Sequence, residues 1–194
     1  MAELRSFFEL LGMLVLDPRT GVLLALLVAA AVSDYRSFRI PNWITGGGLL
    51  FALVYNALVP PEWHAAWTWA PAGMLLGLCA MLPMYAIGAM GAGDVKLMAM
   101  IGAFLGLSGT AHALLFCIVT GGVAALAYAL RKRVMARMLA NAGGVMRGML
   151  WSSVAGNVPS LQAAAMPSVG RLAYGISIAL GTAIYLVAQQ FNLA

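Results

Sequence analysis

The feature that most constrains the fold is a series of long apolar runs separated by short polar connections. The runs lie at residues 21–32, 43–59, 70–88, 95–107, 111–130 and 172–189. A helix of about 20 apolar residues crosses the hydrocarbon core of a bilayer, and only helices or closed barrels satisfy their backbone hydrogen bonds there. Charged residues make up 9% of the chain, against about 25% in soluble domains. We therefore predict an all-α, polytopic membrane helix bundle with about six transmembrane helices.

The chain divides into a short N-terminal segment and one membrane-embedded domain. Residues 1–20 combine an amphipathic start with a turn at Asp17-Pro18, which predicts an interfacial segment. We assign residues 21–194 to a single domain because most connections between the apolar runs are short. Its main loop, residues 131–171, begins with apolar and basic residues near helical spacing. This pattern predicts an interfacial helix that lies on anionic lipid.

Basic residues are distributed unequally about the six predicted spans. Nine fall on one side: Arg36, Arg39, Lys96, Arg131, Lys132, Arg133, Arg137, Arg147 and Arg171. The other two, Arg5 and Arg19, fall on the opposite side. Because cytoplasmic loops are enriched in Lys and Arg, we expect the first side to face the cytoplasm across a plasma (inner) membrane. This distribution accounts for the net charge of +5 without nucleic acid as a partner.

Two of the six acidic residues, Asp34 and Asp94, directly border long apolar segments. Ionisable groups at membrane depth are costly, so each is a candidate functional residue. The predicted topology brings both to the cytoplasmic face. Each also has a purely structural interpretation: Asp94 as a helix N-cap, and Asp34 as a helix-end residue paired with Arg36 or Arg39. Taken together these interpretations are weaker, because the same face holds both acids.

The segment at 91–97 reads Gly91-Ala92-Gly93-Asp94-Val95-Lys96-Leu97. The run at 95–107 gives a helix of only about 20 Å, shorter than the ~30 Å hydrocarbon core. We interpret this as a helix that starts below the membrane surface, with a glycine loop at membrane depth, where irregular backbone must line a cavity or be buried. Gly91 and Gly93 would supply the φ freedom of that loop. Asp94 would then stand at a helix N-terminus in a cavity open to the cytoplasm.

No other set of residues suggests a competing chemistry. Cys79 and Cys117 lie alone in separate apolar runs, so we expect buried thiols and no metal site. His64 and His112 map to the outer side, away from the acids. The glycine segment lacks the ending of a phosphate-binding loop. Two aspartates, in contrast, can hold a water between them, one acting as base toward the water and the other as acid toward a peptide carbonyl.

The residues around both aspartates resemble a known family. Gly91-x-Gly93-Asp94 is similar to the GxGD signature of intramembrane aspartyl proteases, and the segment from Ser33-Asp34-Tyr35-Arg36 to Ile40-Pro41-Asn42 is similar to the first-aspartate motif of bacterial type IV prepilin peptidases. A third similarity covers residues 171–181, the pattern of the family's last helix, although Ala173 stands where a proline is usual. The resemblance extends over nearly the whole chain from about residue 20.

The resemblance is closest to the short TadV/CpaA-like form, which serves Flp-type pili. It implies an aspartic endopeptidase that removes the leader of a prepilin at the cytoplasmic membrane face, with neither metal nor cofactor. It implies Asp34 and Asp94 as the catalytic pair, Gly91 and Gly93 as backbone that lets substrate approach, and Lys96 as a neighbour of the substrate. The other function class that the residues leave open is a small proton-coupled transporter or channel subunit, with Asp34 and Asp94 as a relay.

Overall fold

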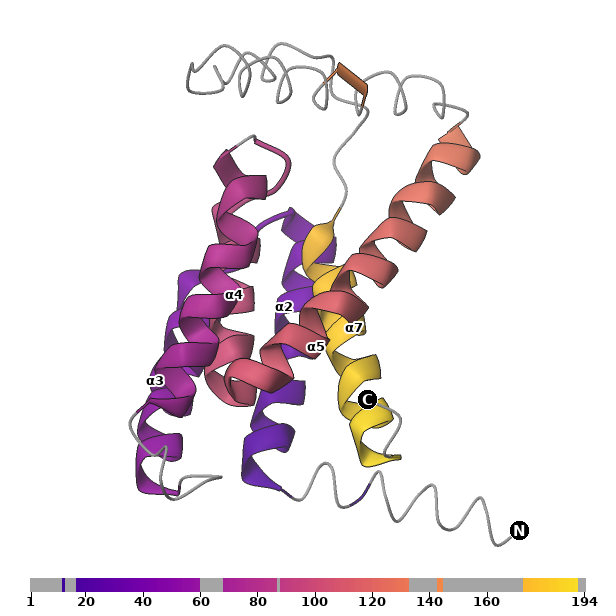
Figure 1. Ribbon diagram of the computed structural model, residues 1–194. Helices are drawn as coiled ribbons and strands as arrows, with labels where there is room; N and C mark the ends of the chain where they lie inside the picture. The colour runs from indigo at the N-terminus through magenta and orange to yellow at the C-terminus, as the bar shows by residue number, and fades with distance from the viewer. Residues whose placement is uncertain are drawn as a thin grey trace, which may run out of the picture.

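A computed structural model describes residues 12, 17–59, 68–86, 88–132, 143–144 and 173–191, and its ordered elements are helices (Figure 1). These are α2 (Pro18–Ser37), α3 (Asn42–Leu58), α4 (Trp69–Ala86), α5 (Ala92–Lys132) and α7 (Tyr174–Gln190). The predicted all-α bundle is thereby confirmed. The predicted interfacial segment at 1–20 and the loop at 131–171 lie almost entirely outside the described residues.

Three of these helices, α2, α4 and α5, are long and apolar enough to cross a membrane. The helices α3 and α7 have 17 residues each, which gives them a length of about 26 Å. Large apolar side chains are exposed in mid-helix, for example Val28, Leu50 and Ile118. Such a surface suits lipid rather than water, so the molecule is an integral membrane protein, whereas the count of six spans stays a prediction.

The helix α2 extends beyond the predicted run 21–32 at both ends. Asp17 caps its N-terminus by accepting a hydrogen bond from the Thr20 N–H at 3.3 Å. At the other end Phe38 adopts left-handed backbone angles, φ 50° and ψ 33°, and its N–H donates to the Asp34 carbonyl. The Ser33 hydroxyl donates to the Arg39 carbonyl at 2.8 Å, which holds the chain in this turn. Asp34 therefore lies inside the last turn of the helix.

The helix α5 joins the predicted spans 95–107 and 111–130 across a sharp break. The break is at Gly106, where φ is 70° and ψ is −173°, angles that favour glycine. A Cβ there would also collide with the indole of Trp69. We call residues 92–105 the first arm and residues 107–132 the second arm. The two arms run in nearly opposite directions along the bundle (Figure 1).

Small and polar residues bring the helices together. A Cβ on Gly73 of α4 would overlap the Gly102 carbonyl of the first arm, so the two backbones touch, as small residues allow in membranes. Asn56 of α3 donates to the Ala103 carbonyl at 2.9 Å. Thr120 of the second arm donates to the Ser177 carbonyl of α7, also at 2.9 Å. The first arm is consequently the central element of the bundle.

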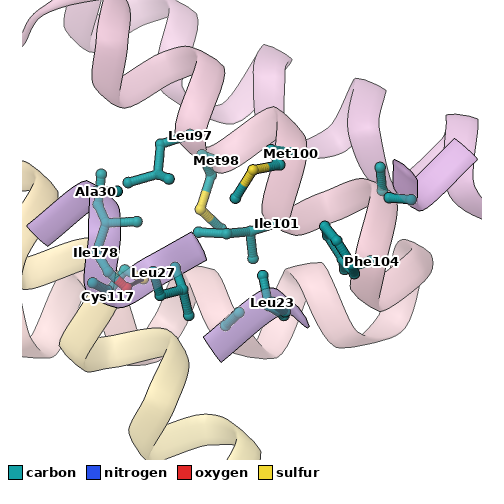
Figure 2. Close-up of a cluster of buried hydrophobic side chains, with 14 of the residues drawn as sticks. Leu23, Leu27, Ala30, Leu97, Met98, Met100, Ile101, Phe104, Cys117 and Ile178 are labelled. Carbon is teal, nitrogen blue, oxygen red and sulfur yellow. Dashed lines mark hydrogen bonds between the residues drawn. The ribbon is translucent and has the colours of Figure 1, made fainter. Parts of the chain in front are cut away.

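The apolar core lies around the first arm of α5. Leu97, Met98, Met100, Ile101 and Phe104 are fully buried. Figure 2 shows these side chains close to Leu23 and Leu27 of α2 and to Ile178 of α7. The core thereby fixes the first arm between α2, α4 and α7, and it sets where the arm begins, at the end of the bundle that holds the candidate site.

The carboxyl end of α2 and the amino ends of α5 and α7 lie at the same end of the bundle, the upper end in Figure 1. Among the described residues this end also holds most basic side chains: Arg36, Arg39, Lys96, Arg131 and Lys132. Arg19 lies at the opposite end, where it donates to the Val59 carbonyl at 2.9 Å. The predicted grouping of both aspartates with the basic residues is therefore present in the fold.

Candidate active site

Asp34 is buried against the N-terminus of α7. Its residue surface is 5% exposed, and the backbone amides of Gly175 and Ile176 are directed at its carboxylate. The carboxylate is so close that a Cβ on Gly175 would stand 2.8 Å from Asp34 Oδ2. A helix N-terminus presents free N–H groups and a positive dipole end, which offsets part of the cost of burying a negative charge. Within the described part of the chain, Asp34 forms no ion pair with Arg36 or Arg39, contrary to the structural interpretation of its position.

Asp94 is also buried, at 8% exposure, in the first turn of α5. Its Oδ2 accepts a hydrogen bond from the Gly91 N–H at 3.1 Å, and its own N–H donates to the Gly91 carbonyl at 3.1 Å. Helix α5 begins at Ala92, so Asp94 is its third residue and not the N-cap. The pattern is that of a capping box, in which the side chain at the third position closes back on the cap. One carboxylate oxygen is thereby committed to the turn.

The end of α2, which carries Asp34, and the start of α5, which carries Asp94, both lie next to the start of α7. Ile40, in the α2–α3 connection, packs between their segments. A Cβ on Gly93 would stand 3.3 Å from the Ile40 Cβ, and one on Gly175 would stand 3.0 Å from the Ile40 Cδ1. The two predicted motifs and the start of α7 thus meet around one apolar side chain.

A hydrogen bond also joins the two motifs directly. Lys96 Nζ donates to Asn42 Oδ1 at 2.9 Å, which links α5 to the first residue of α3. The Lys96 side chain is exposed, so its ammonium group remains in contact with the membrane surface or with water. In this structure the hydrogen-bond partner of Lys96 is therefore Asn42, in the segment that follows Asp34.

The glycines have a different role from the one expected. Among the described glycines only Gly88 and Gly106 have positive φ, so φ freedom at Gly91 and Gly93 was the wrong reason for these residues. Gly93 lies within α5 and provides room for Ile40. Gly91 places its N–H on the Asp94 side chain. Neither glycine has a side chain, so both leave space beside Asp94. Their contribution is this space and not a special backbone conformation.

The cysteine and histidine predictions had mixed outcomes. Cys117 is buried as expected and donates to the Ile178 carbonyl at 3.4 Å, but Cys79 is exposed. The reason is that Cys79 lies on the outer face of α4, which a run of apolar residues alone does not distinguish from the inner one. His112 is bonded to the Ser108 carbonyl near the end of the bundle opposite Asp94. His64 lies outside the described residues, and in the described ranges no three His, Cys, Asp or Glu side chains form a metal-type cluster.

An apolar groove of about 420 Å³ lies between α4, the second arm of α5 and α7. Met90 and Tyr174 are among its lining residues, and neither aspartate is. Sequence reasoning did not predict this groove, and it gave no role to Ile40, Gly175 or Tyr174. The similarity at residues 171–181 is the signal that could have directed attention to the last two, whereas nothing local marks Ile40 as a contact between the motifs.

Two carboxyls that are buried where the same helix ends meet have a limited set of chemical uses. Like charges held close together do not both ionise readily, so such a pair tends to share a proton. One carboxyl is then an acid and the other a base at the same moment, as acid–base hydrolysis requires.

Comparisons with known proteins place the chain in a family. Residues 21–126 match the model of the type IV leader peptidase family, a range that includes both aspartates. A prepilin leader peptidase/N-methyltransferase of Bacillus subtilis (strain 168) is 35% identical over 121 residues, which cover 60% of this chain and 46% of that relative. The chain thus spans less than half the length of this relative. No solved structure matches the chain. Since the family model matches more than half of its residues, the chain belongs to the type IV leader peptidase family.

Proposed function

We propose that this protein is a membrane aspartic endopeptidase that removes the leader peptide of prepilins, with Asp34 and Asp94 as its catalytic pair. The observation that carries the proposal is the meeting of two motif-bearing helix ends around Ile40, where both carboxylates are buried. The relative's name, which includes prepilin leader peptidase, supports the substrate class. The proposal covers peptide hydrolysis alone and no methyl transfer.

The reaction uses the pair as one acid and one base. The ionised carboxylate takes a proton from a water molecule as the water oxygen attacks the scissile carbonyl carbon. The protonated carboxyl donates its proton to the carbonyl oxygen. When the tetrahedral intermediate collapses, the carbon–nitrogen bond breaks. The leaving amine then receives a proton from the carboxyl that had taken a proton from the water. Burial strengthens these interactions because it lowers the local dielectric constant.

The proposed reaction takes place at the cytoplasmic face of the inner membrane, on prepilins of the Flp type. The basic residues at the carboxylate end of the bundle support this orientation. The prepilin class rests on the similarity of the motifs to the short form of the family. Leader and carboxylates would then meet where α2 ends and α5 begins, with Gly91, Gly93 and Lys96 near the bound peptide.

The depth of the two carboxyls favours peptidase over transport. Asp34 lies in the last turn of α2 and Asp94 in the first turn of α5. A proton relay across the bilayer needs ionisable groups near the middle of the bundle. The two aspartates are instead grouped at one end, where a peptide at the membrane surface can reach them.

The test replaces each aspartate by asparagine, which keeps the shape and removes the acid or base. Cleavage of a co-expressed Flp-type prepilin should fall by about 10²-fold or more in Asp34→Asn and in Asp94→Asn. The double variant should be little worse than either one, because residues that act as a unit are not additive. Cleavage rates are measured from the mobility shift of the substrate, with enzyme levels normalised in isolated membranes.

Asp17→Asn is the matched control. Asp17 caps α2 at the opposite end of the bundle, and Asn caps as well as Asp does, so cleavage should stay at the wild-type level. A second control is exhaustive chelation, after which purified enzyme should remain active. Robust cleavage by Asp34→Asn would contradict the assignment of Asp34 and Asp94 as a catalytic pair. The transporter hypothesis would then be preferred.

A further inference from the structure

Each aspartate stands near one end of an unbroken helical segment whose other end lies toward the opposite end of the bundle. On α2, Asp34 is 15 residues from Arg19, which corresponds to about 22 Å. On the first arm of α5, Asp94 is 12 residues from Gly106, or about 18 Å. Because a helix moves largely as a rigid element, the contacts that hold the far ends affect how the two carboxylates meet.

Arg19 is the second residue of α2, and its side chain contacts two other helices. The guanidinium lies over the ring of Tyr55 in α3, 5.7 Å from the centroid, and over the ring of Trp69 in α4, 5.4 Å from the centroid. It also donates a hydrogen bond to the Val59 carbonyl, just past the end of α3, at 2.9 Å. Aromatic faces and helix C-termini both attract a cation. One side chain therefore holds α2 to the end of α3 and the start of α4.

Trp69 extends this contact to the end of the first arm. Its indole lies against the backbone of Gly106, where a Cβ would collide with the ring. Gly106 has a positive φ of 70° and is the point at which α5 changes direction. Arg19, Trp69 and Gly106 are thus in contact in succession, and they connect the far end of α2 with the far end of the first arm.

The contacts between α2 and the first arm in the core are of another kind. Leu27 of α2 belongs to one buried apolar cluster with Met98 and Ile101 of the first arm (Figure 2). Apolar contacts have no preferred direction, and methionine adapts its shape to its neighbours. They hold the two helices together but fix the position of α2 along its own axis only weakly. A planar guanidinium that is both stacked and hydrogen-bonded fixes this position much more closely.

The helix α3 completes the connection between the two aspartate-bearing elements. Asn56 of α3 donates to the Ala103 carbonyl of the first arm, and Lys96 of the first arm donates to Asn42 at the start of α3. These directional bonds hold α3 and the first arm to each other near both ends of α3. At the end opposite the aspartates, Arg19 supplies the directional contact from α2 to α3.

We infer that Arg19 is a positioning residue for the two aspartates. Through its contacts with Tyr55 and Trp69, it fixes the position of α2 along its axis relative to the first arm. This position decides how Asp34 is aligned with Asp94 at the opposite end of the bundle. The inference rests on the proposed peptidase function for its kinetic consequence, whereas its geometric consequence can be measured without cleavage.

The first test measures the position of the end of α2 by disulfide formation. In a protein that lacks Cys79 and Cys117, Ile40→Cys is combined with Gly93→Cys. A Cβ on Gly93 would stand 3.3 Å from the Ile40 Cβ, close to the ~3.8 Å typical of a disulfide. Because disulfide geometry is specific, Arg19→Met should slow the oxidation of this pair about five-fold or more. Thiol labelling of the protein in isolated membranes gives the rate.

The matched control pair is Gly121→Cys with Ser177→Cys, which joins the second arm of α5 to α7. A Cβ on Gly121 would stand 4.0 Å from the Ser177 Cβ, a distance that a disulfide spans. This pair does not involve α2, so Arg19→Met should leave its rate of oxidation unchanged. Equal slowing of both pairs would mean that Arg19 holds the whole bundle together, and unchanged oxidation of the first pair would mean that α2 keeps its position. Either result would overturn the inference.

The second test is kinetic and uses the purified enzyme below its unfolding temperature. Arg19→Met should lower kcat for a short prepilin peptide about ten-fold and leave KM within about two-fold, since misplaced catalytic groups slow the chemical step. Tyr55→Phe is the control, because phenylalanine keeps the ring face that the guanidinium covers, and its kcat should equal that of the wild type.

The two tests together separate this inference from the proposed function. If the wild-type protein cleaves no prepilin, the peptidase is rejected, and slower oxidation of the pair at positions 40 and 93 in Arg19→Met still supports the geometric part. If the wild-type protein cleaves and Arg19→Met keeps the same kcat, the peptidase is retained and Arg19 is not a positioning residue.

Discussion

At the residue scale, the candidate site depends on close contacts between the two carboxylates and neighbouring backbone groups. Asp34 faces the amide end of α7, and Asp94 closes a turn on Gly91. The Asp94 carboxylate is thus oriented by a backbone N–H, and the Asp34 carboxylate by its packing against Gly175. The packing is tight at Gly175, where a single added carbon would touch both the Asp34 carboxylate and Ile40.

Gly175→Ala should therefore reduce activity without unfolding the protein. The new Cβ would stand 2.8 Å from Asp34 Oδ2, so the carboxylate must shift, and small misplacements of catalytic groups cost up to about 10²-fold in rate. The loss should appear in kcat for a short peptide, measured with purified enzyme.

Gly47→Ala provides the matched comparison for this substitution. It is also a helical glycine, but a Cβ there meets nothing within 4 Å, so it should leave the rate unchanged. Full activity of Gly175→Ala would contradict the tight contact between α7 and Asp34.

At the element scale, three helix ends assemble the site, and their contacts decide its geometry. The end of α2, the start of α5 and the start of α7 meet around Ile40. The first arm of α5 is held from below by the core, and the hydrogen bond between Lys96 and Asn42 holds it to α3 at the surface. We interpret this bond as a positioning device for the two aspartate segments.

Removal of the bond should lower kcat modestly. An exposed hydrogen bond contributes about 0.5–1.5 kcal/mol, so Lys96→Met and Asn42→Ala should each reduce the rate by about two- to ten-fold. The double variant should equal the single ones, because both remove the same interaction. Lys132→Met, which changes another exposed basic residue, should have no effect. Strictly additive losses in the double variant would mean that the two residues act separately, for example with Lys96 on the substrate.

At the scale of the whole molecule, the bundle has one basic end and this end carries the carboxylates. Reporter fusions after Arg39 and after Arg133 should therefore indicate the cytoplasm, and a fusion near Trp67 should indicate the outer side. Paired reporters that are active on opposite sides of the membrane provide the measurement. A reversed pattern would place the site on the outer face and remove the proposed cytoplasmic reaction.

The all-helical membrane class, most helix positions and the two candidate aspartates could be read from the amino-acid sequence alone. These are local properties of the sequence. The length of an apolar run predicts a membrane-spanning helix, and a charged residue beside such a run is uncommon. The extension of α2 through Asp34 was not predicted, because the left-handed turn at Phe38 depends on Ser33 and Arg39 folding back together.

The surroundings of those aspartates depend on how the helices pack in three dimensions. The proximity of Gly175 to Asp34 and the packing of Ile40 against Gly93 both join residues far apart in the chain. Such contacts follow from how the helices pack and cross, and the break at Gly106 reverses the direction of α5. The residues that approach across a bundle are therefore fixed by packing, which the periodicity of a single helix does not encode.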